Sequence, residues 1–246
     1  MKKSGYVLLV STLAVLLGAG SAMATSLDLT TAGASGTING AFFQQVPDQS
    51  TGTGVIDTFV RLQANDLESG YNTDGTLEFD TKSGLFTHSL LLSDVPLVNG
   101  KRQFLLDINE NQGGDNEFIS LYELELYLGA TGDLTGYPNL GDKVWDLDEG
   151  NDGDSTIELN FMLNPGSGAG DMFAYIPESF FAESTNSYVY LYSAFGKPNA
   201  SDDGFEEWAI VGEDDETVPP VPEPATLLLL GFGLVGLAGV SRKLRK

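Results

Sequence analysis

The last 26 residues of the chain, Val221–Lys246, limit which part of it can fold in water. They hold a Pro-Glu-Pro triplet, an uncharged apolar run from Ala225 to Val240, and a basic end. As a helix the run would rise roughly 24 Å at about 1.5 Å per residue, somewhat less than a hydrocarbon core of about 30 Å. Cations beside a short apolar segment stay on the cytoplasmic side. The pattern therefore predicts a single C-terminal transmembrane helix over residues 225–241, with the rest of the chain outside.

The order of these three parts resembles the C-terminal sorting signal of PEP-CTERM proteins. The triplet is Pro222, Glu223 and Pro224, and the basic end consists of Arg242, Lys243, Arg245 and Lys246. The resemblance covers the tail alone. It implies that an exosortase, a membrane cysteine transpeptidase, recognises the triplet, cuts near it and transfers the outer part to the cell surface or to extracellular polysaccharide. The chain would then be the substrate of that enzyme, first anchored in the inner membrane of a Gram-negative-type bacterium. A plain single-span anchor is the alternative.

The N-terminus has the pattern of a secretory signal peptide. Two lysines precede an apolar stretch, Val7–Leu17, and Ala22 and Ala24 form an A-x-A cleavage pattern. This pattern predicts cleavage before Thr25. The expected organisation is a signal peptide over residues 1–24, an ectodomain over 25–212, an acidic and proline-rich linker over 213–221, and the sorting signal over 222–246.

The charge of the ectodomain excludes nucleic acid as a partner. Of the 12 Lys and Arg residues six lie in the two terminal segments, whereas only one of the 35 Asp and Glu residues does. The region between them therefore carries 34 acids against six bases, and binding nucleic acid requires a basic patch. The chain has no cysteine and one histidine, His88, which excludes disulfides, thiol catalysis and a multi-histidine metal centre. Dense carboxylates suit Ca²⁺ or a solvated surface.

Hydrophobic periodicity predicts an all-β ectodomain. In Tyr122–Leu128 the large apolar residues alternate with Glu123 and Glu125, which places Tyr122 on the core face. About ten short strands separated by Gly, Asn, Asp and Pro clusters are typical of a two-sheet β-sandwich or jelly roll. The expected strands are Thr37–Phe43, Val55–Gln63, Thr76–Asp80, Leu85–Leu92, Gln103–Ile108, Tyr122–Leu128, Lys143–Leu147, Thr156–Leu163, Met172–Ile176, Tyr188–Phe195 and Glu207–Val211.

Two acidic loops are candidate calcium sites. Oxygen ligands at alternate positions after a strand can wrap a calcium ion. The candidate ligands are Asp107, Asn109, Asn111 and Asp115 in the first loop, and Asp146, Asp148, Asp152 and Asp154 in the second. The first loop departs from the EF-hand pattern, because Gln112 stands where glycine is expected. The alternative in both loops is a solvated turn whose carboxylates accept hydrogen bonds from local N–H groups.

The leading functional interpretation is a non-enzymatic structural or interaction protein displayed at the cell surface. A calcium-dependent carbohydrate-binding module is the first alternative, because aromatic residues on strands can stack on sugars, although such residues more often serve core or cross-strand packing. The aromatic candidates are Trp145, Trp208, Tyr188, Tyr190 and Tyr192. A secreted hydrolase is the second alternative, but carboxylates are too numerous here to single out a catalytic pair.

Overall fold

The computed structural model describes residues 25–47, 56–110, 117–148, 155–166, 168–202 and 204–211. The predicted signal peptide, linker, sorting triplet, transmembrane helix and basic end all lie outside these ranges. Within them, no helix has the length and apolar character needed to span a bilayer. The predicted boundaries of those segments therefore stay predictions.

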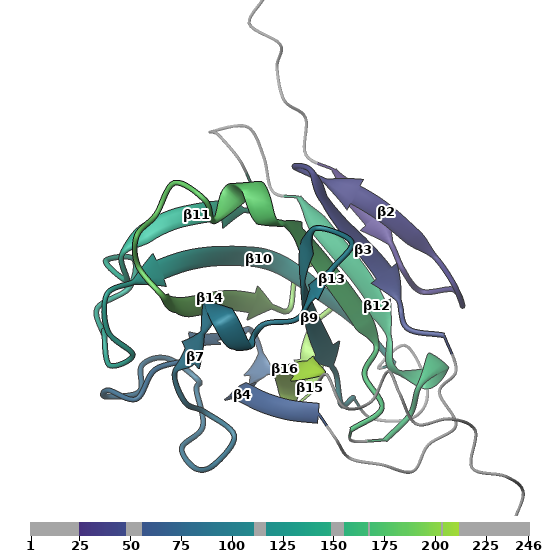
Figure 1. Ribbon diagram of the computed structural model, residues 1–246. Helices are drawn as coiled ribbons and strands as arrows, with labels where there is room; N and C mark the ends of the chain where they lie inside the picture. Colours follow the sequence, from purple (N-terminus) through teal and green to yellow (C-terminus); the bar gives the residue numbers. More distant parts are fainter. Residues whose placement is uncertain are drawn as a thin grey trace, which may run out of the picture.

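The described part of the chain is all-β, as predicted, and forms two large sheets (Figure 1). The strands of the first sheet are β1 (Ser26–Asp28), β6 (Glu68–Tyr71), β7 (Leu90–Leu91), β10 (Phe118–Gly129), β11 (Asp142–Asp146), β12 (Thr156–Asn160) and β14 (Tyr188–Phe195). Those of the second are β2 (Ser35–Ile38), β3 (Ala41–Gln45), β4 (Ile56–Leu62), β8 (Leu97–Val98), β9 (Lys101–Asp107), β13 (Met172–Pro177) and β16 (Glu206–Val211). Helical structure in the described residues is limited to the 3-10 turns η1 (Leu92–Asp94), η2 (Phe161–Leu163) and η3 (Glu178–Phe180).

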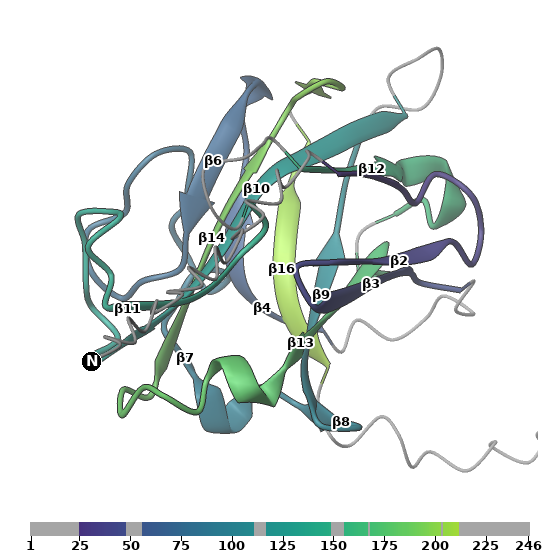
Figure 2. The same ribbon diagram turned by 90° about the horizontal axis from the view of Figure 1, so that it is seen from above.

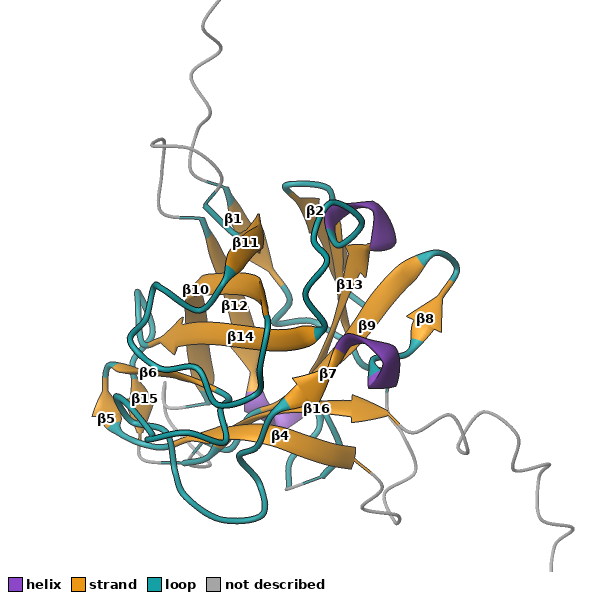
Figure 3. Cartoon of the chain, turned by 60° about the vertical axis from the view of Figure 1, so that its left-hand side comes forward, coloured by secondary structure: helices purple, strands orange, loops and turns teal. Residues whose placement is uncertain are grey.

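The strand order explains which segments can meet. The first sheet runs β1-β12-β10-β14-β6, and β11 and β7 pair with β10 and β14 respectively. The second runs β2-β3-β13-β9-β16-β4, so the last strand, β16, lies between β9 and β4 (Figure 2). A short separate pair joins β5 (Asn65–Asp66) to β15 (Ser201–Asp202), at the lower left of Figure 3.

One hydrophobic core joins the inner faces of the two sheets. In several strands alternate residues enter it, as the period-two pattern of a half-buried strand requires. Its members include Leu124, Leu126 and Leu128 of β10, Phe104 and Leu106 of β9, and Trp208 and Ile210 of β16. This arrangement confirms the predicted two-sheet, all-β architecture.

A second cluster covers the outer face of the first sheet. It consists of Tyr71, Tyr127, Leu140, Tyr190, Tyr192 and Ala194, with Tyr122, Leu134, Tyr137 and Tyr188 packed against it. Tyr137, from the segment between β10 and β11, stacks on Tyr192 with ring centroids 4.0 Å apart and an interplanar angle of 17°. The outer face of this sheet is therefore packed under a loop.

Three strand predictions need correction. Thr37–Phe43 is not one strand but the β2–β3 hairpin, because Asn39 and Gly40 both have positive φ (46° and 79°) and form a two-residue turn. Thr76–Asp80 is not a strand, and Phe79 there has a φ of 57°, which interrupts an extended backbone. Leu85–Leu92 is extended only at β7.

Tyr122 lies on the opposite face from the one predicted. The pairing of β10 with β14 shifts register between Leu121 and Glu123, which is a β-bulge. The extra residue puts both Leu121 and Leu124 into the core and sends Tyr122 to the outer cluster.

Candidate functional site

The described part of the first acidic loop holds Asp107 and Asn109. Asp107 ends β9 and is fully buried, and its Oδ2 accepts a hydrogen bond from the N–H of Gly168 at 2.5 Å. The Asn109 amide donates to the carbonyl of Phe205 at 3.3 Å. Asn111 and Asp115 lie outside the described residues, so a calcium ion shared by all four residues stays a prediction. Within the described residues, Asp107 supports the loop before β13.

Asp107 has a second buried carboxylate beside it. Asp171 accepts a hydrogen bond from the N–H of Ile108 at 2.8 Å through Oδ2. The Oδ1 atoms of Asp107 and Asp171 have no hydrogen-bond partner among the described residues. Burial raises the pKa of Asp107 to about 6 and that of Asp171 well above its ordinary value, and mutual repulsion adds to the shift in Asp171. This pair therefore tends to hold a proton in the folded state.

The described part of the second acidic loop holds Asp146 and Asp148. Asp146 Oδ1 accepts a hydrogen bond from the N–H of Asp148 at 2.8 Å, and Asp148 Oδ1 accepts one from the N–H of Ser155 at 2.5 Å. These bonds fix the two ends of the loop. Asp152 and Asp154 lie outside the described residues, so calcium binding by this loop also stays a prediction.

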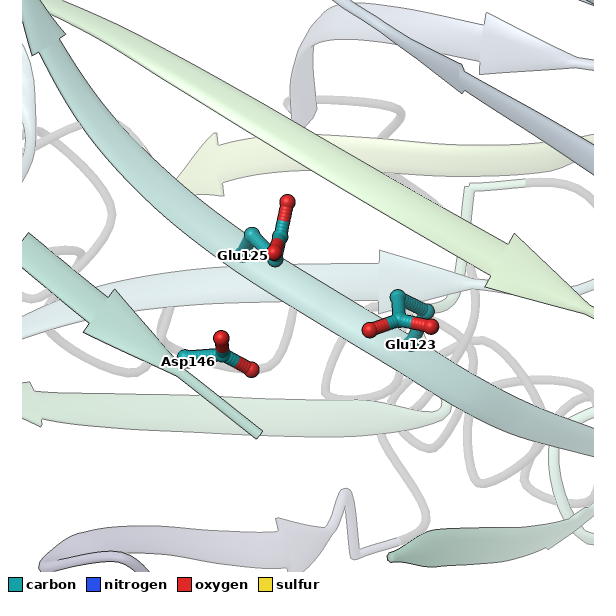
Figure 4. A group of neighbouring side chains, drawn as sticks. All are labelled: Glu123, Glu125 and Asp146. Carbon is teal, nitrogen blue, oxygen red and sulfur yellow. The ribbon is translucent and has the colours of Figure 1, made fainter. Parts of the chain in front are cut away.

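The sheet brings Asp146 close to two acids that sequence reasoning did not include in a site. Glu123 and Glu125 lie two residues apart on β10, and Glu125 is the register partner of Asp146 on β11. One carboxylate oxygen from each residue lies within 4.8 Å of the other two (Figure 4). The alternation of β10 indicates that Glu123 and Glu125 lie on one face. The strand that pairs beside them, and its register, cannot be derived from β10 alone.

Lys143 neutralises part of the charge of this group. The ammonium of Lys143 lies 3.0 Å from Oε1 of Glu125 and 2.6 Å from Oδ2 of Asp146. The Tyr127 hydroxyl donates to Oε2 of Glu125 at 2.6 Å. Partial burial alone would lower the pKa of Lys143, but the hydrogen bonds to Asp146 and Glu125 raise it to about 12. The arrangement is an ion-pair network with a resident cation.

Glu123 lies at the edge of this network and has no salt-bridge partner within the described residues. Burial, followed by repulsion from Asp148 and Glu125, raises the pKa of Glu123 to about 7. The group can therefore exchange one proton near neutral pH.

Removing the lysine tests how strongly it supports the network. Lys143→Met is expected to lower the free energy of unfolding by about 1–2 kcal/mol, because it leaves the buried Glu125 carboxylate without its cation. The loss is limited because the Lys143 side chain is 44% exposed. Urea denaturation measures it, with Lys143→Arg as the charge-conserving control. Equal stability of the Met variant and the wild type would contradict this role.

The aromatic candidates for sugar stacking pack against other side chains of the protein. Trp145 and Trp208 belong to the core between the sheets, and Tyr190 and Tyr192 belong to the buried outer cluster. Tyr188 is half-buried beside that cluster. The Trp145 indole donates to the carbonyl of Asn39 at 3.0 Å. These contacts agree with the packing interpretation of the five residues.

The C-terminal tail is the segment that comparison with known proteins identifies. Residues 220–243 match the family model of the PEP-CTERM protein-sorting motif. Neither a curated protein nor a solved structure matches the chain. The motif implies an exosortase as processing partner and indicates an exported, membrane-processed protein of the cell surface. The chain thus carries a PEP-CTERM sorting motif at its C-terminal tail, as its Pro-Glu-Pro triplet, apolar run and basic end predict.

Proposed function

We propose that the chain is a non-enzymatic structural or interaction protein with a jelly-roll-like β-sandwich ectodomain. A signal peptide exports it, and a transmembrane helix over residues 225–241 holds the precursor in the inner membrane. An exosortase then cuts near Pro222–Pro224 and transfers the ectodomain to the cell surface or the extracellular polysaccharide matrix. The observation that carries the proposal is the motif match over residues 220–243.

The position of the domain within the chain supports this proposal. The carbonyl of Thr25 accepts a hydrogen bond from the N–H of Thr156 at 2.9 Å, so the fold uses the residue that follows the predicted cleavage site. The last strand, β16, ends at Val211, before the linker begins. Both predicted cuts would therefore fall beside the folded domain without removing a strand.

Replacing both prolines of the triplet tests the sorting role. Pro222→Ala with Pro224→Ala is expected to leave the full-length protein in the membrane fraction, because the enzyme loses the residues that it recognises. Mass spectrometry of both chain ends and fractionation of the producing cells measure this. Pro219→Ala, just outside the matched residues, is the matched control and should be processed normally. Normal trimming of the double variant would refute the proposed processing.

A further inference from the structure

Three glutamates enter the space between the two sheets at one end of the core. Glu206 begins β16 and shares its inward face with Trp208, while Glu110 follows β9 on the face of Ile108. Glu68 begins β6 in the other sheet and is the register partner of the core residue Phe195. The exposed fractions of Glu68, Glu110 and Glu206 are 1%, 6% and 0%. Both sheets therefore contribute a buried carboxylate to the same region.

The protein supplies hydrogen-bond donors to only some of the oxygens of these three carboxylates. Oε2 of Glu68 accepts a hydrogen bond from the N–H of Ala64 at 2.8 Å, and Oε2 of Glu110 accepts one from the N–H of Asp202 at 3.0 Å. Oε1 of Glu68, Oε1 of Glu110 and both oxygens of Glu206 have no hydrogen-bond partner among the described residues. Within those same residues, no lysine, arginine or histidine forms an ion pair with any of the three.

The three groups interact with one another. Burial, together with the neighbouring Asp202 and Glu68, raises the pKa of Glu110 to about 9. Burial also raises the pKa of Glu206 well above its usual range, and Glu68 and then Glu110 contribute to the shift. Such a cluster is costly to bury unless protons or a cation neutralise it. Protons can satisfy part of the cluster, one shared by Glu68 and Glu206 and one shared by Glu110 and Asp202, and a cation would replace them.

The group of Glu123, Glu125 and Asp146 indicates that the three buried glutamates need a cation. That group has similar chemistry, but the Lys143 ammonium lies within it. Glu68, Glu110 and Glu206 do not meet the 4.8 Å spacing of that group, so their side chains would have to close around a shared ion. The donors are all oxygen, which favours a hard cation over zinc or copper. Ca²⁺ accepts six to eight oxygen ligands in flexible geometry, whereas Mg²⁺ requires a near-ideal octahedron and keeps several waters.

We propose that Glu68, Glu110 and Glu206 bind one Ca²⁺ ion between the two sheets. Glu68 and Glu206 would bridge the sheets through the ion, and Glu110 would complete the carboxylate set from the end of β9. The β5–β15 pair (Figure 3) closes this end of the core, because Ser201 donates to the carbonyl of Ala64 at 3.2 Å. Its three ligands differ from those predicted in the acidic loops, although Glu110 belongs to the first loop. The ion would act as a clamp between the two sheets.

Thermal unfolding of the purified full-length protein in detergent, with Ca²⁺ or with EDTA at pH 7, tests the proposal. At a calcium concentration about 100 times the Kd, the Tm is expected to rise by roughly 5–10 °C. The same concentration of Mg²⁺ should give a smaller shift. Tb³⁺ supplies a second readout, because Trp208, two residues from Glu206 on the same face, should sensitise its luminescence.

Glu206→Gln should abolish both the calcium shift and the Tb³⁺ signal. In EDTA this variant should unfold at a higher temperature than the wild type, because it removes one of three repelling charges, and a merely structural glutamate would not give this reversal. Glu123→Gln is the matched control and should keep the shift. Glu110→Gln serves the same purpose if Glu206→Gln does not fold. The proposal is overturned by a wild-type Tm that does not respond to calcium, by a shift that survives Glu206→Gln or Glu110→Gln, or by one that Glu123→Gln removes.

Discussion

Trp208→Ala is expected to lower the free energy of unfolding by about 3–5 kcal/mol, the range for removing a fully buried large aromatic side chain. Trp208 is fully buried and lies in the core that both sheets share. Its indole N–H also donates to the hydroxyl of Ser193 at 3.1 Å, which connects β16 to β14 of the opposite sheet. The substitution would therefore leave a cavity and remove a bond between the sheets. Urea denaturation measures the loss. It is monitored by circular dichroism of the backbone, because the substitution removes a tryptophan and changes the fluorescence.

Two further variants separate the contributions of volume and hydrogen bonding. Trp208→Phe keeps most of the ring volume and should lose less than the alanine variant, although it leaves the Ser193 hydroxyl without its donor. Leu85→Ala, at a side chain that is 90% exposed, should change stability by no more than about 0.5 kcal/mol. A Trp208→Ala variant as stable as Leu85→Ala would show that the two sheets do not depend on this core.

The second large effect concerns the dependence of stability on pH. Burial raises the pKa of Asp107 from 3.8 to about 6 in the folded state. The folded state therefore binds a proton more tightly than the unfolded state does. The resulting stabilisation is complete below pH 3.8 and is lost as the pH rises through about 6. A shift of about two units corresponds to roughly 3 kcal/mol.

Asp107→Asn isolates this contribution, because asparagine keeps an oxygen for the N–H of Gly168 and does not titrate. Relative to the wild type, the variant should gain roughly 3 kcal/mol of stability between pH 4 and pH 7. Asp171, Glu207 and Arg61 also act on the Asp107 carboxylate and remain in both proteins. Urea titrations in EDTA across this range measure the difference. Parallel pH profiles for the two proteins would contradict the raised pKa.

Strands with one apolar face are predicted well from the sequence. Segments that contain a turn are predicted poorly. Val55–Gln63 alternates clearly and contains β4. Thr37–Phe43 also alternates, but it contains Asn39-Gly40, which is among the strongest hairpin signals. Giving that dipeptide more weight would have corrected the prediction. The bulge at Tyr122 has no comparable local signal, because it depends on how β10 pairs with β14.

The candidate sites also show how little local spacing in the sequence predicts about neighbours in the fold. Sequence reasoning grouped acids that are close in the chain, and the structure groups acids that are close across strands. Asp146 lies beside Glu125 because β10 and β11 pair in one register. Glu68 and Glu206 face the same interior from different sheets. Neither neighbourhood follows from local spacing, since each requires the strand order.

The position of β16 between β9 and β4 determines when the second sheet can be completed during export. Until Glu206–Val211 has crossed the translocation channel, β4 and β9 have no strand between them to join. Completing the second sheet therefore waits for the final strand, and such sequence-distant pairings form slowly. Under the proposed topology, the last strand would arrive and the apolar tail would enter the bilayer at nearly the same time. A holdase that shields the unpaired edges of β4 and β9 during export would then assist folding.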